Sequence, residues 1–192
     1  RSAGLNFSRA TISATETVTV GAVNHAPTIA IPSSTAITSE DTPLDLTGAT
    51  VSDPDSGDIL TATMSVSHGA LVPLGSFVGL TVIDGNGADG TLTIQGSASA
   101  ISAALSSGVT YTPTSNYNGQ DHLLRDVSDT HGGSDRKQVP INITAVNDGP
   151  VATITPTTYA ATEQVALTLK NTGLSISDVD AGSGSMTVTL SV

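Results

Sequence analysis

Short runs of alternating apolar and polar residues recur along this chain. The clearest run, 59–66, places Leu60, Ala62, Met64 and Val66 at every second position. Successive side chains of a β-strand point to opposite faces of a sheet, so this alternation predicts strands with one buried face. The same pattern, together with apolar runs bounded by turn residues, predicts further strands at 28–31, 43–51, 71–72, 80–83, 91–94, 109–112, 123–127 and 139–146.

One segment follows a helical pattern instead. Residues 97–105 carry Ile101 and Leu105 four positions apart, on the same face of a helix, and Ser97 can cap its N-terminus. Elsewhere the short strands follow one another without a regular strand–helix–strand alternation. We therefore predict an all-β fold in which antiparallel sheets pack as a two-layer sandwich, with one short helix.

Two stretches of the chain share one pattern. The first begins N-H-A-P at Asn24 and reaches D-P-D at 53–55, and the second begins N-D-G-P at Asn147 and reaches D-V-D at 178–180. A glutamate stands 16 residues after each of these two asparagines. A period of about 120 residues suits one small β-domain and is too long for a solenoid turn. We therefore predict three parts: the end of a preceding repeat that closes with a strand near 17–20 (1–23), a complete repeat (24–146) and the incomplete start of the next repeat (147–192).

The third part should not be stable alone. It holds only the opening strands of a sandwich, so its apolar side chains would face water. At ~25 cal/mol per Å² of apolar area, such exposure forfeits several kcal/mol, comparable to the whole stability of a domain. We expect 147–192 to be ordered only where something covers it. Strand pairing between chains is favoured over pairing with 1–23 of the same chain, which lies at the opposite end.

Composition and charge narrow the class of protein. Cys is absent, so no disulfide framework holds the fold, and no run approaches the ~18 apolar residues of a membrane span. Seventeen acidic residues face six Lys and Arg, for a net charge of −11. The chain therefore lacks the basic surface that nucleic-acid binding requires.

Fourteen of the acidic residues are Asp, and they gather in loops. Asp is a good turn residue, which accounts for Asp84 and Asp89 in a predicted hairpin turn. Turn propensity explains poorly why an Asp-x-Asp motif returns at the same place in both repeats. Paired carboxylates repel one another unless a cation lies between them, and Ca²⁺ prefers such clusters of oxygen ligands. The sequence therefore predicts Ca²⁺ at these loops.

Three motifs follow in order: Y-T-P-T-S-N-Y-N-G-Q-D from Tyr111, V-S-D-T-H-G-G from Val127 and A-V-N-D-G-P from Ala145. With the helical I-S-A-A-L segment, they resemble the cadherin-like repeats of giant bacterial surface adhesins and related secreted calcium-binding repeat proteins. The resemblance covers essentially the whole chain. It implies an extracellular rod of Ig-like, cadherin-like sandwiches that Ca²⁺ stiffens between neighbours and that extends a binding or anchoring domain away from the cell.

Loops of an Ig-like sandwich can be assigned to its two ends, because its strands run alternately up and down. The Glu40 turn and the N-G-Q-D loop then fall at the end that meets the next repeat. Their arrangement resembles the cadherin linker site and implies a Ca²⁺ site at what we call the second junction, with the ligands Glu40, Asp121, Asn147, Asp148, Asp178 and Asp180. Six such side chains suffice for one ion with about six to eight ligands, or for two with backbone carbonyls and water. The alternative is a hydrogen-bonded linker in which Asp residues cap turns.

A first junction is predicted at the other end of the complete repeat, where the candidate ligands are Asn24, Asp53, Asp55 and Asp129. It departs from the pattern of the second junction, because His25 stands where the second linker has Asp148. A neutral imidazole is a poor ligand for Ca²⁺.

Arg125 is unexpected, since alternation places it on the same face as Leu123 and Val127, which should be the core. Either a bulge turns Arg125 outward, or its side chain reaches the sheet edge and pairs with an acid.

No catalytic arrangement stands out. The four histidines lack zinc-binding spacing, and Asp121-His122 has no accompanying G-x-S-x-G elbow, so we predict no enzymatic activity.

The expected function is that of a structural and adhesive module, a Ca²⁺-stiffened spacer on a bacterial cell surface whose partners are neighbouring repeats. Two alternatives remain open. One is a subunit of an extracellular filament assembled by strand pairing between chains. The other is a module that binds a glycan or protein, although the absence of Trp and the presence of only three Tyr and two Phe leave few stacking platforms. A cluster of Tyr111, Tyr117 and a Phe on one exposed face would favour it.

Overall fold

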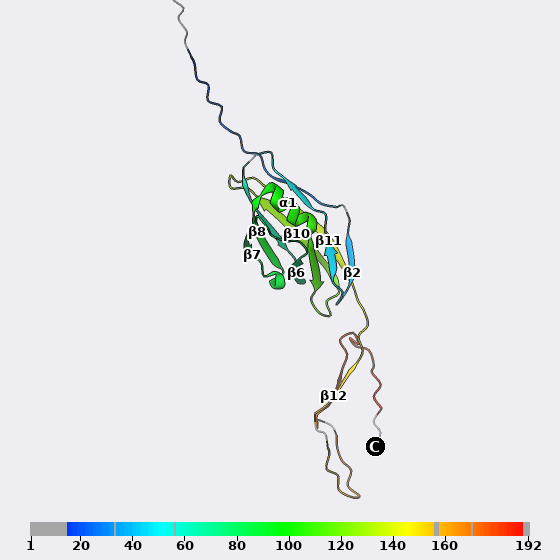
Figure 1. Ribbon diagram of the computed structural model, residues 1–192. Helices are drawn as coiled ribbons and strands as arrows, with labels where there is room; N and C mark the ends of the chain where they lie inside the picture. Colours follow the sequence, from blue (N-terminus) through cyan, green and yellow to red (C-terminus); the bar gives the residue numbers. More distant parts are fainter. Residues whose placement is uncertain (1–14, 33, 56, 156–157, 170, 190–192) are drawn as a thin grey trace, which may run out of the picture.

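The computed structural model describes residues 15–32, 34–55, 57–155, 158–169 and 171–189. The β-rich body spans residues 28–144. An N-terminal stretch extends from one end of it, and the segment 147–189 extends from the other (Figure 1).

The larger sheet has six strands in the order β2–β11–β10–β5–β8–β7. These strands are β2 (Ala36–Ser39), β11 (Ser134–Thr144), β10 (Gly119–Ser128), β5 (Ile59–Ser65), β8 (Thr91–Ser97) and β7 (Thr81–Asp84). Neighbouring strands run antiparallel, except that β2 runs parallel to β11. The predicted antiparallel arrangement therefore has one local exception, at this edge.

The second layer contains a three-stranded sheet of β3 (Leu44–Leu46), β9 (Val109–Pro113) and β6 (Gly69–Pro73), with β9 in the middle. A separate antiparallel pair joins β1 (Thr28–Ala30) to β4 (Thr50–Ser52). After β1 the chain therefore leaves its partner β4, passes Pro32 and continues as β2 beside β11.

The core lies between these layers and follows the predicted alternation. In β5 the side chains of Leu60, Ala62 and Met64 are buried, whereas the residues between them are half-exposed. Leu92, Ile94, Leu123, Ile141 and Tyr111 are fully buried on the strands around them. Complete burial of a large apolar side chain contributes about 1.5–3 kcal/mol. The predicted all-β sandwich is confirmed.

The one α-helix in the described part of the chain is α1 (Ala98–Ser107), as predicted. The Ser97 hydroxyl accepts a hydrogen bond from the Ala100 N–H (3.3 Å), and Ile101 and Leu105 pack into the core. At the C-terminus Gly108 adopts φ +85°, and a Cβ there would lie 2.3 Å from the Leu46 carbonyl oxygen. Only glycine fits this close approach.

Two features of the strands differ from the prediction. The predicted strand 43–51 is divided into β3 and β4, because Gly48 adopts φ +83° between them and redirects the chain. Strand β2 was missed, since it is short and its Ile37 faces solvent with 65% of its surface exposed. Its pairing with β11, about 100 residues later, is not encoded in local periodicity.

Arg125 points into the sandwich and is only 2% exposed. Strand β10 is regular here, with Arg125 opposite Met64 on one side and Lys137 on the other. No acid lies within ion-pairing distance of it among the described residues. Both predicted explanations, a bulge and an ion pair, were therefore wrong.

The flanking segments contain little regular structure. Residues 15–23 form no strand, so the strand predicted near 17–20 is not found in this chain. A strand requires a partner for its backbone groups, and no described strand pairs with this stretch. In 147–189, β12 (Val151–Ile154) pairs with β13 (Leu174–Ser177), and Val151 and Ile154 remain about 60% exposed.

Candidate functional site

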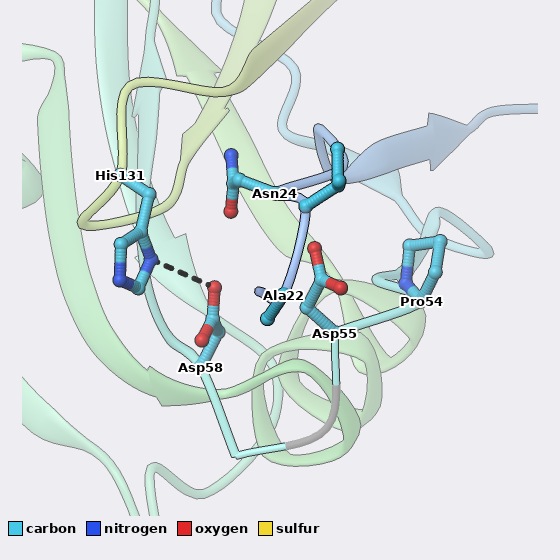
Figure 2. A pocket seen from close by; sticks show the side chains of 7 residues that line it. Ala22, Asn24, Pro54, Asp55, Asp58 and His131 are labelled. Carbon is cyan, nitrogen blue, oxygen red and sulfur yellow. Dashed lines mark hydrogen bonds and ion pairs between the residues drawn. The ribbon is translucent and has the colours of Figure 1, made fainter. Parts of the chain in front are cut away.

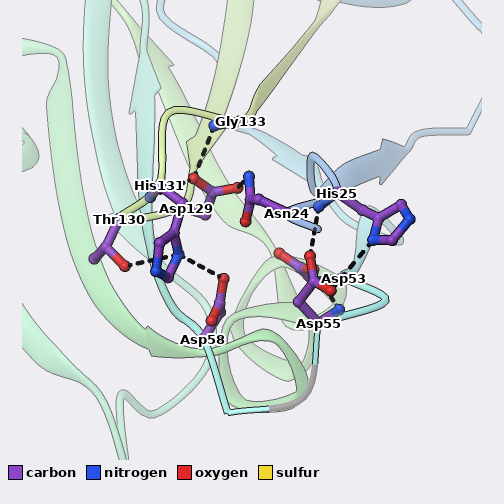
Figure 3. Close-up of polar contacts among 9 residues, drawn as sticks. All are labelled: Asn24, His25, Asp53, Asp55, Asp58, Asp129, Thr130, His131 and Gly133. Carbon is purple, nitrogen blue, oxygen red and sulfur yellow. Dashed lines mark hydrogen bonds and ion pairs between the residues drawn. The ribbon is translucent and has the colours of Figure 1, made fainter. Parts of the chain in front are cut away.

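Three aspartates converge where the N-terminal stretch enters the sandwich (Figure 3). Asp53 follows β4, Asp58 precedes β5 and Asp129 follows β10, so three different strand ends deliver them. One carboxylate oxygen from each lies within 4.8 Å of the other two. We call this set the three-aspartate cluster. Asp129 is only 9% exposed, so part of the cluster is shielded from water.

Hydrogen bonds hold Asp129 in place. Its Oδ2 accepts from the Asn24 side-chain amide (3.0 Å), and its Oδ1 accepts from the backbone N–H groups of His131 and Gly133 (both 2.8 Å). The bond from Asn24 is the main cause that lowers the pKa of Asp129, and the backbone N–H groups add to it. Asp129 is therefore a pre-oriented carboxylate next to the linker.

The other two members are less completely satisfied. Asp53 accepts a hydrogen bond from the Asp55 N–H through Oδ1 (2.9 Å), but its buried Oδ2 has no partner among the described residues. The Oδ2 of Asp58 lies 3.2 Å from His131 Nδ1. A hollow of about 380 Å³ adjoins this group and is lined by Asn24, Asp55, Asp58 and His131, among others (Figure 2).

Asp55 plays a different part from the one its motif suggested. Its Oδ2 accepts from the backbone N–H of His25 (2.5 Å), and its Oδ1 lies 3.2 Å from His25 Nδ1. The backbone hydrogen bond from His25, followed by the bond to its side chain, lowers the pKa of Asp55. The structure therefore ties Asp55 to the linker backbone, while Asp58 completes the cluster.

The sequence reasoning missed Asp58 as a candidate ligand. Its signal was its position directly before the predicted strand that starts at Ile59, at the end of the acidic loop. The two ends of a short loop between strands lie close together. Asp53 and Asp58 stand at the two ends of the loop between β4 and β5, so both were candidates for the same site.

At the second junction the linker contacts the next acidic loop. The Asp148 N–H donates to Asp180 Oδ2 (2.5 Å), and the Asp180 N–H donates to Asp178 Oδ1 (2.9 Å). The same two bonds occur at the first junction, from His25 to Asp55 and from Asp55 to Asp53. The two linkers thus share one backbone geometry.

Glu40 lies at the end of the sandwich from which this linker leaves. It is only 2% exposed, and its two carboxylate oxygens accept from the Val146 N–H (2.6 Å) and from the Asn118 side-chain amide (3.4 Å). The side-chain amide of Asn147 donates to the Asp148 carbonyl oxygen (2.8 Å). Asp148 Oδ2 is buried without a partner among the described residues.

Asp121 is not part of this junction, although the sequence analysis placed it there. Its carboxylate accepts hydrogen bonds from the N–H groups of Ser67 (3.1 Å) and His68 (2.8 Å) and from the Tyr111 hydroxyl (3.0 Å). It is 3% exposed and lies near the N-terminal end of β10, on the strand face that points into the core. Burial and the charge of Asp121 raise the pKa of Tyr111. Asp121 is a structural acceptor inside the fold.

Asp148 provides a test of the second junction through pH. Desolvation, followed by the negative charges of Asp180, Asp41, Glu40 and Asp178, raises the pKa of Asp148. A folded contact that raises the pKa of a carboxyl is more stable when that carboxyl is protonated. This stabilisation is lost as the pH rises through the raised pKa. In chelator, we therefore expect the contact between Asp148 and Asp180 to tighten as the pH falls from about 7 to about 4. The measurement is the amide NMR shift of Asp148.

The first junction supplies the internal control. The pKa of Asp129 is lowered, and its hydrogen bonds come from an amide and from backbone N–H groups that do not titrate, so the contact between Asp129 and Asn24 should hold over the same pH range and be lost only below it. The variant D148N should abolish the transition at the second junction. Persistence of the transition in D148N, or tightening of the contact between Asp129 and Asn24 in parallel with that between Asp148 and Asp180, would contradict the assignment.

Comparison with known proteins agrees with this architecture. A family model described as a bacterial Ig domain matches residues 24–142. No curated protein matches the sequence. Among solved structures, a cohesin module from the family 33 glycoside hydrolase of Clostridium perfringens ATCC13124 is similar, with 9% identity, a TM-score of 0.31 and coverage of 63% of this chain and 97% of the module. A similarity of this extent says nothing about what the chain binds.

Proposed function

The chain belongs to the bacterial Ig domain family, and from this premise we propose that it is a Ca²⁺-stiffened spacer module of a bacterial adhesin. Domains of this family are often extracellular or surface-exposed. No helix in the described residues is long and apolar enough to span a membrane. In this proposal the chain has no catalytic role. The sandwich sets the length of the spacer, and the junctions limit bending between neighbouring repeats.

The observation that carries the proposal is the three-aspartate cluster. Three carboxylate oxygens within 4.8 Å of one another repel strongly unless a cation lies between them. One of these side chains, Asp53, keeps a buried oxygen that has no hydrogen-bond donor in the described part of the chain. Carboxylate oxygens from several loops, completed by backbone carbonyls and water, are the ligands that Ca²⁺ prefers. The residues present therefore fit a Ca²⁺ ion.

The position of the cluster links the ion to stiffness. Asn24 belongs to the linker and donates to Asp129, so an ion at the cluster would restrain the point where the linker enters the sandwich. The second junction repeats the linker geometry, and there Asp148 again has a buried carboxylate oxygen with no partner among the residues described. A second ion there, near Glu40, Asp148, Asp178 and Asp180, would restrain the next hinge in the same way.

Of the alternatives, the filament subunit has a supporting observation. Apolar side chains in 151–189 are left exposed, among them Ile154, Leu167 and Val188. Strands of another chain would cover them. The glycan-binding alternative loses its support, because Tyr111 is buried and Tyr117 stacks on His68 with ring centroids 4.0 Å apart. The exposed aromatic cluster that would favour sugar binding is therefore not formed by these two residues.

A Ca²⁺ titration followed by two-dimensional amide NMR tests the proposal at each junction separately. We expect saturable shifts at Asn24, Asp53 and Asp129, with a Kd of about 10⁻⁴–10⁻³ M, the range of extracellular modules. The double variant D53N/D129N should lose these shifts and keep those at Asp148, because the two junctions lie at opposite ends of the sandwich.

The matched control is D89N, which neutralises an exposed Asp that is not a proposed ligand of either junction and caps a turn by accepting from the Thr91 N–H (3.0 Å). It should bind Ca²⁺ as the unaltered chain does. If Ca²⁺ causes no local shifts, or if D53N/D129N retains them, the cluster is a set of turn-capping residues and the spacer requires no metal.

A further inference from the structure

A second pocket opens at the edge of the sandwich, away from both junctions. It lies between the edge strands β2 and β3, where the chain passes Pro32 on its way from one sheet to the other. Its volume is about 270 Å³. The walls are mainly apolar, with Pro32, Ala36, Leu44, Leu46 and Val139 among them.

The inner wall of this pocket contains the guanidinium-bearing side chain of Arg125. Only 2% of the surface of Arg125 is exposed. Neither Nε nor Nη1 has a hydrogen-bond partner among the described residues. The nearest acid in the wall, Asp45, forms no ion pair with it and instead accepts a hydrogen bond from the Thr110 hydroxyl (2.6 Å). Across the strand pair, Lys137 is bonded to Asp135 (2.9 Å). Arg125 is thus a buried cation whose Nε and Nη1 have no acceptor among the residues that the structure describes.

An unpaired cation in this position lowers the stability of the fold, so a ligand that pairs with it would recover part of the loss. Burial lowers the pKa of Arg125 to about 10, so the side chain remains a cation at neutral pH. A buried charge is normally paired, and removal from water without a partner carries a penalty of several kcal/mol. A guanidinium is a planar fork of N–H donors, and because Nε and Nη1 are enclosed, a ligand in this pocket meets the fork through its remaining nitrogen, which can donate a charge-assisted hydrogen bond to a carboxylate oxygen.

We propose that this edge pocket binds the carboxylate of a small, largely apolar acid through Arg125. The single positive charge of the inner wall, Asp45 in the outer wall and the net charge of −11 together favour a monoanion over a dianion. The apolar walls favour an aliphatic body over a hydroxylated one. A short fatty acid combines a carboxylate with such an aliphatic body, whereas a uronic acid shares the carboxylate but has a hydroxylated body.

The test compares ligands on the unaltered chain by amide NMR. Hexanoate, glucuronate, hexanamide and inorganic phosphate are titrated separately, and shifts are followed at Ala36, Leu46, Thr47 and Val139. Hexanoate should bind at least about tenfold more tightly than its neutral isostere hexanamide, because the amide lacks the charge that pairs with the guanidinium. Glucuronate should bind more weakly than hexanoate, and binding of glucuronate as tight as that of hexanoate would overturn the proposed preference for an apolar body.

Variants then assign the interaction to Arg125. R125M keeps the length and apolar stem of the side chain and should lose hexanoate binding. R125K should retain a part of it, since an ammonium supplies charge without the fork. The matched control is R136M, which removes an exposed arginine of β11 that pairs with Asp126, and it should bind as the unaltered chain does.

Thermal unfolding of the free R125M chain gives an independent readout. Replacing an unpaired buried cation by an apolar side chain should leave the unfolding temperature unchanged or raise it. Equal binding of hexanoate and hexanamide, binding of phosphate as tight as that of hexanoate, or undiminished binding to R125M would overturn the proposal. The comparison of hexanoate with hexanamide needs no variant, so it decides the question even if R125M does not fold.

Discussion

Replacing Asp121 by alanine should destabilise the sandwich by about 3–5 kcal/mol, a large share of the 5–15 kcal/mol that holds a typical domain together. The carboxylate accepts from the backbone N–H groups of Ser67, His68 and His122 and from the Tyr111 hydroxyl. Alanine would leave several of these donors without acceptors, and each buried unsatisfied group costs about 1–3 kcal/mol. Urea unfolding followed by far-UV circular dichroism measures the loss.

The matched control is D126A, which removes an aspartate from the same strand. Asp126 lies on the outer face of β10 and pairs with the exposed side chain of Arg136, so its loss should cost about 0–1 kcal/mol. D121N should be nearly as damaging as D121A, because two donors face each carboxylate oxygen of Asp121 and either orientation of the amide would set its NH₂ group against donors. Equal stability of D121A and D126A would show that the buried acceptor is dispensable.

Asp121 also shows where reasoning from the sequence went wrong. The burial pattern of β10 places Asp121, Leu123, Arg125 and Val127 inside. The predicted strand began at 123, so the alternation was applied to Arg125 but not to Asp121, which was assigned to a loop. Strand ends are set by non-local pairing, here Gly119 with Ile143, and local pattern does not reveal them. The inward-facing Asp121 was therefore assigned as a ligand of the second junction.

Elements whose apolar pattern is local were predictable. Strands β5 and β8 and the helix α1 with its Ser97 cap lie where alternation and capping placed them. The parallel pairing of β2 with β11 was not predictable, because β2 has one buried residue, Thr38, and no apolar face of its own.

The candidate site was predictable to a similar degree. Topology correctly brought Asn24, Asp53 and Asp129 to one end of the sandwich. Which acid of the loop 53–58 joins them depends on the turn itself: the Asp55 carboxylate accepts from the linker N–H of His25, which leaves Asp58 to face the cluster. Backbone hydrogen bonds of this kind carry no signature in residue type, so the sequence indicated the acids but not their roles.

Amide hydrogen exchange should divide the chain into two regimes. Amides in β10 and β11 should exchange about 10³–10⁸-fold more slowly than those of an unfolded chain, because only global unfolding exposes them. Amides in β12 and β13 should show little protection, since an isolated pair of short strands is marginal in water. In that pair Val151 and Ile154 are about 60% exposed, so burial contributes little to holding it together. Exchange measured residue by residue by NMR in dilute solution tests this.

Two isoleucines provide matched variants for the same contrast. Ile94 in β8 is fully buried, whereas Ile154 in β12 is 61% exposed. I94A should lower the free energy of unfolding by about 2–5 kcal/mol through lost burial and a residual cavity, and I154A should change it by less than about 0.5 kcal/mol. Protection of β12 and β13 that rises with protein concentration would show that strands of another chain cover the segment. Strong protection that does not depend on concentration, together with a large loss in I154A, would contradict the prediction, because it would mean that 147–189 folds as a stable unit within a single chain.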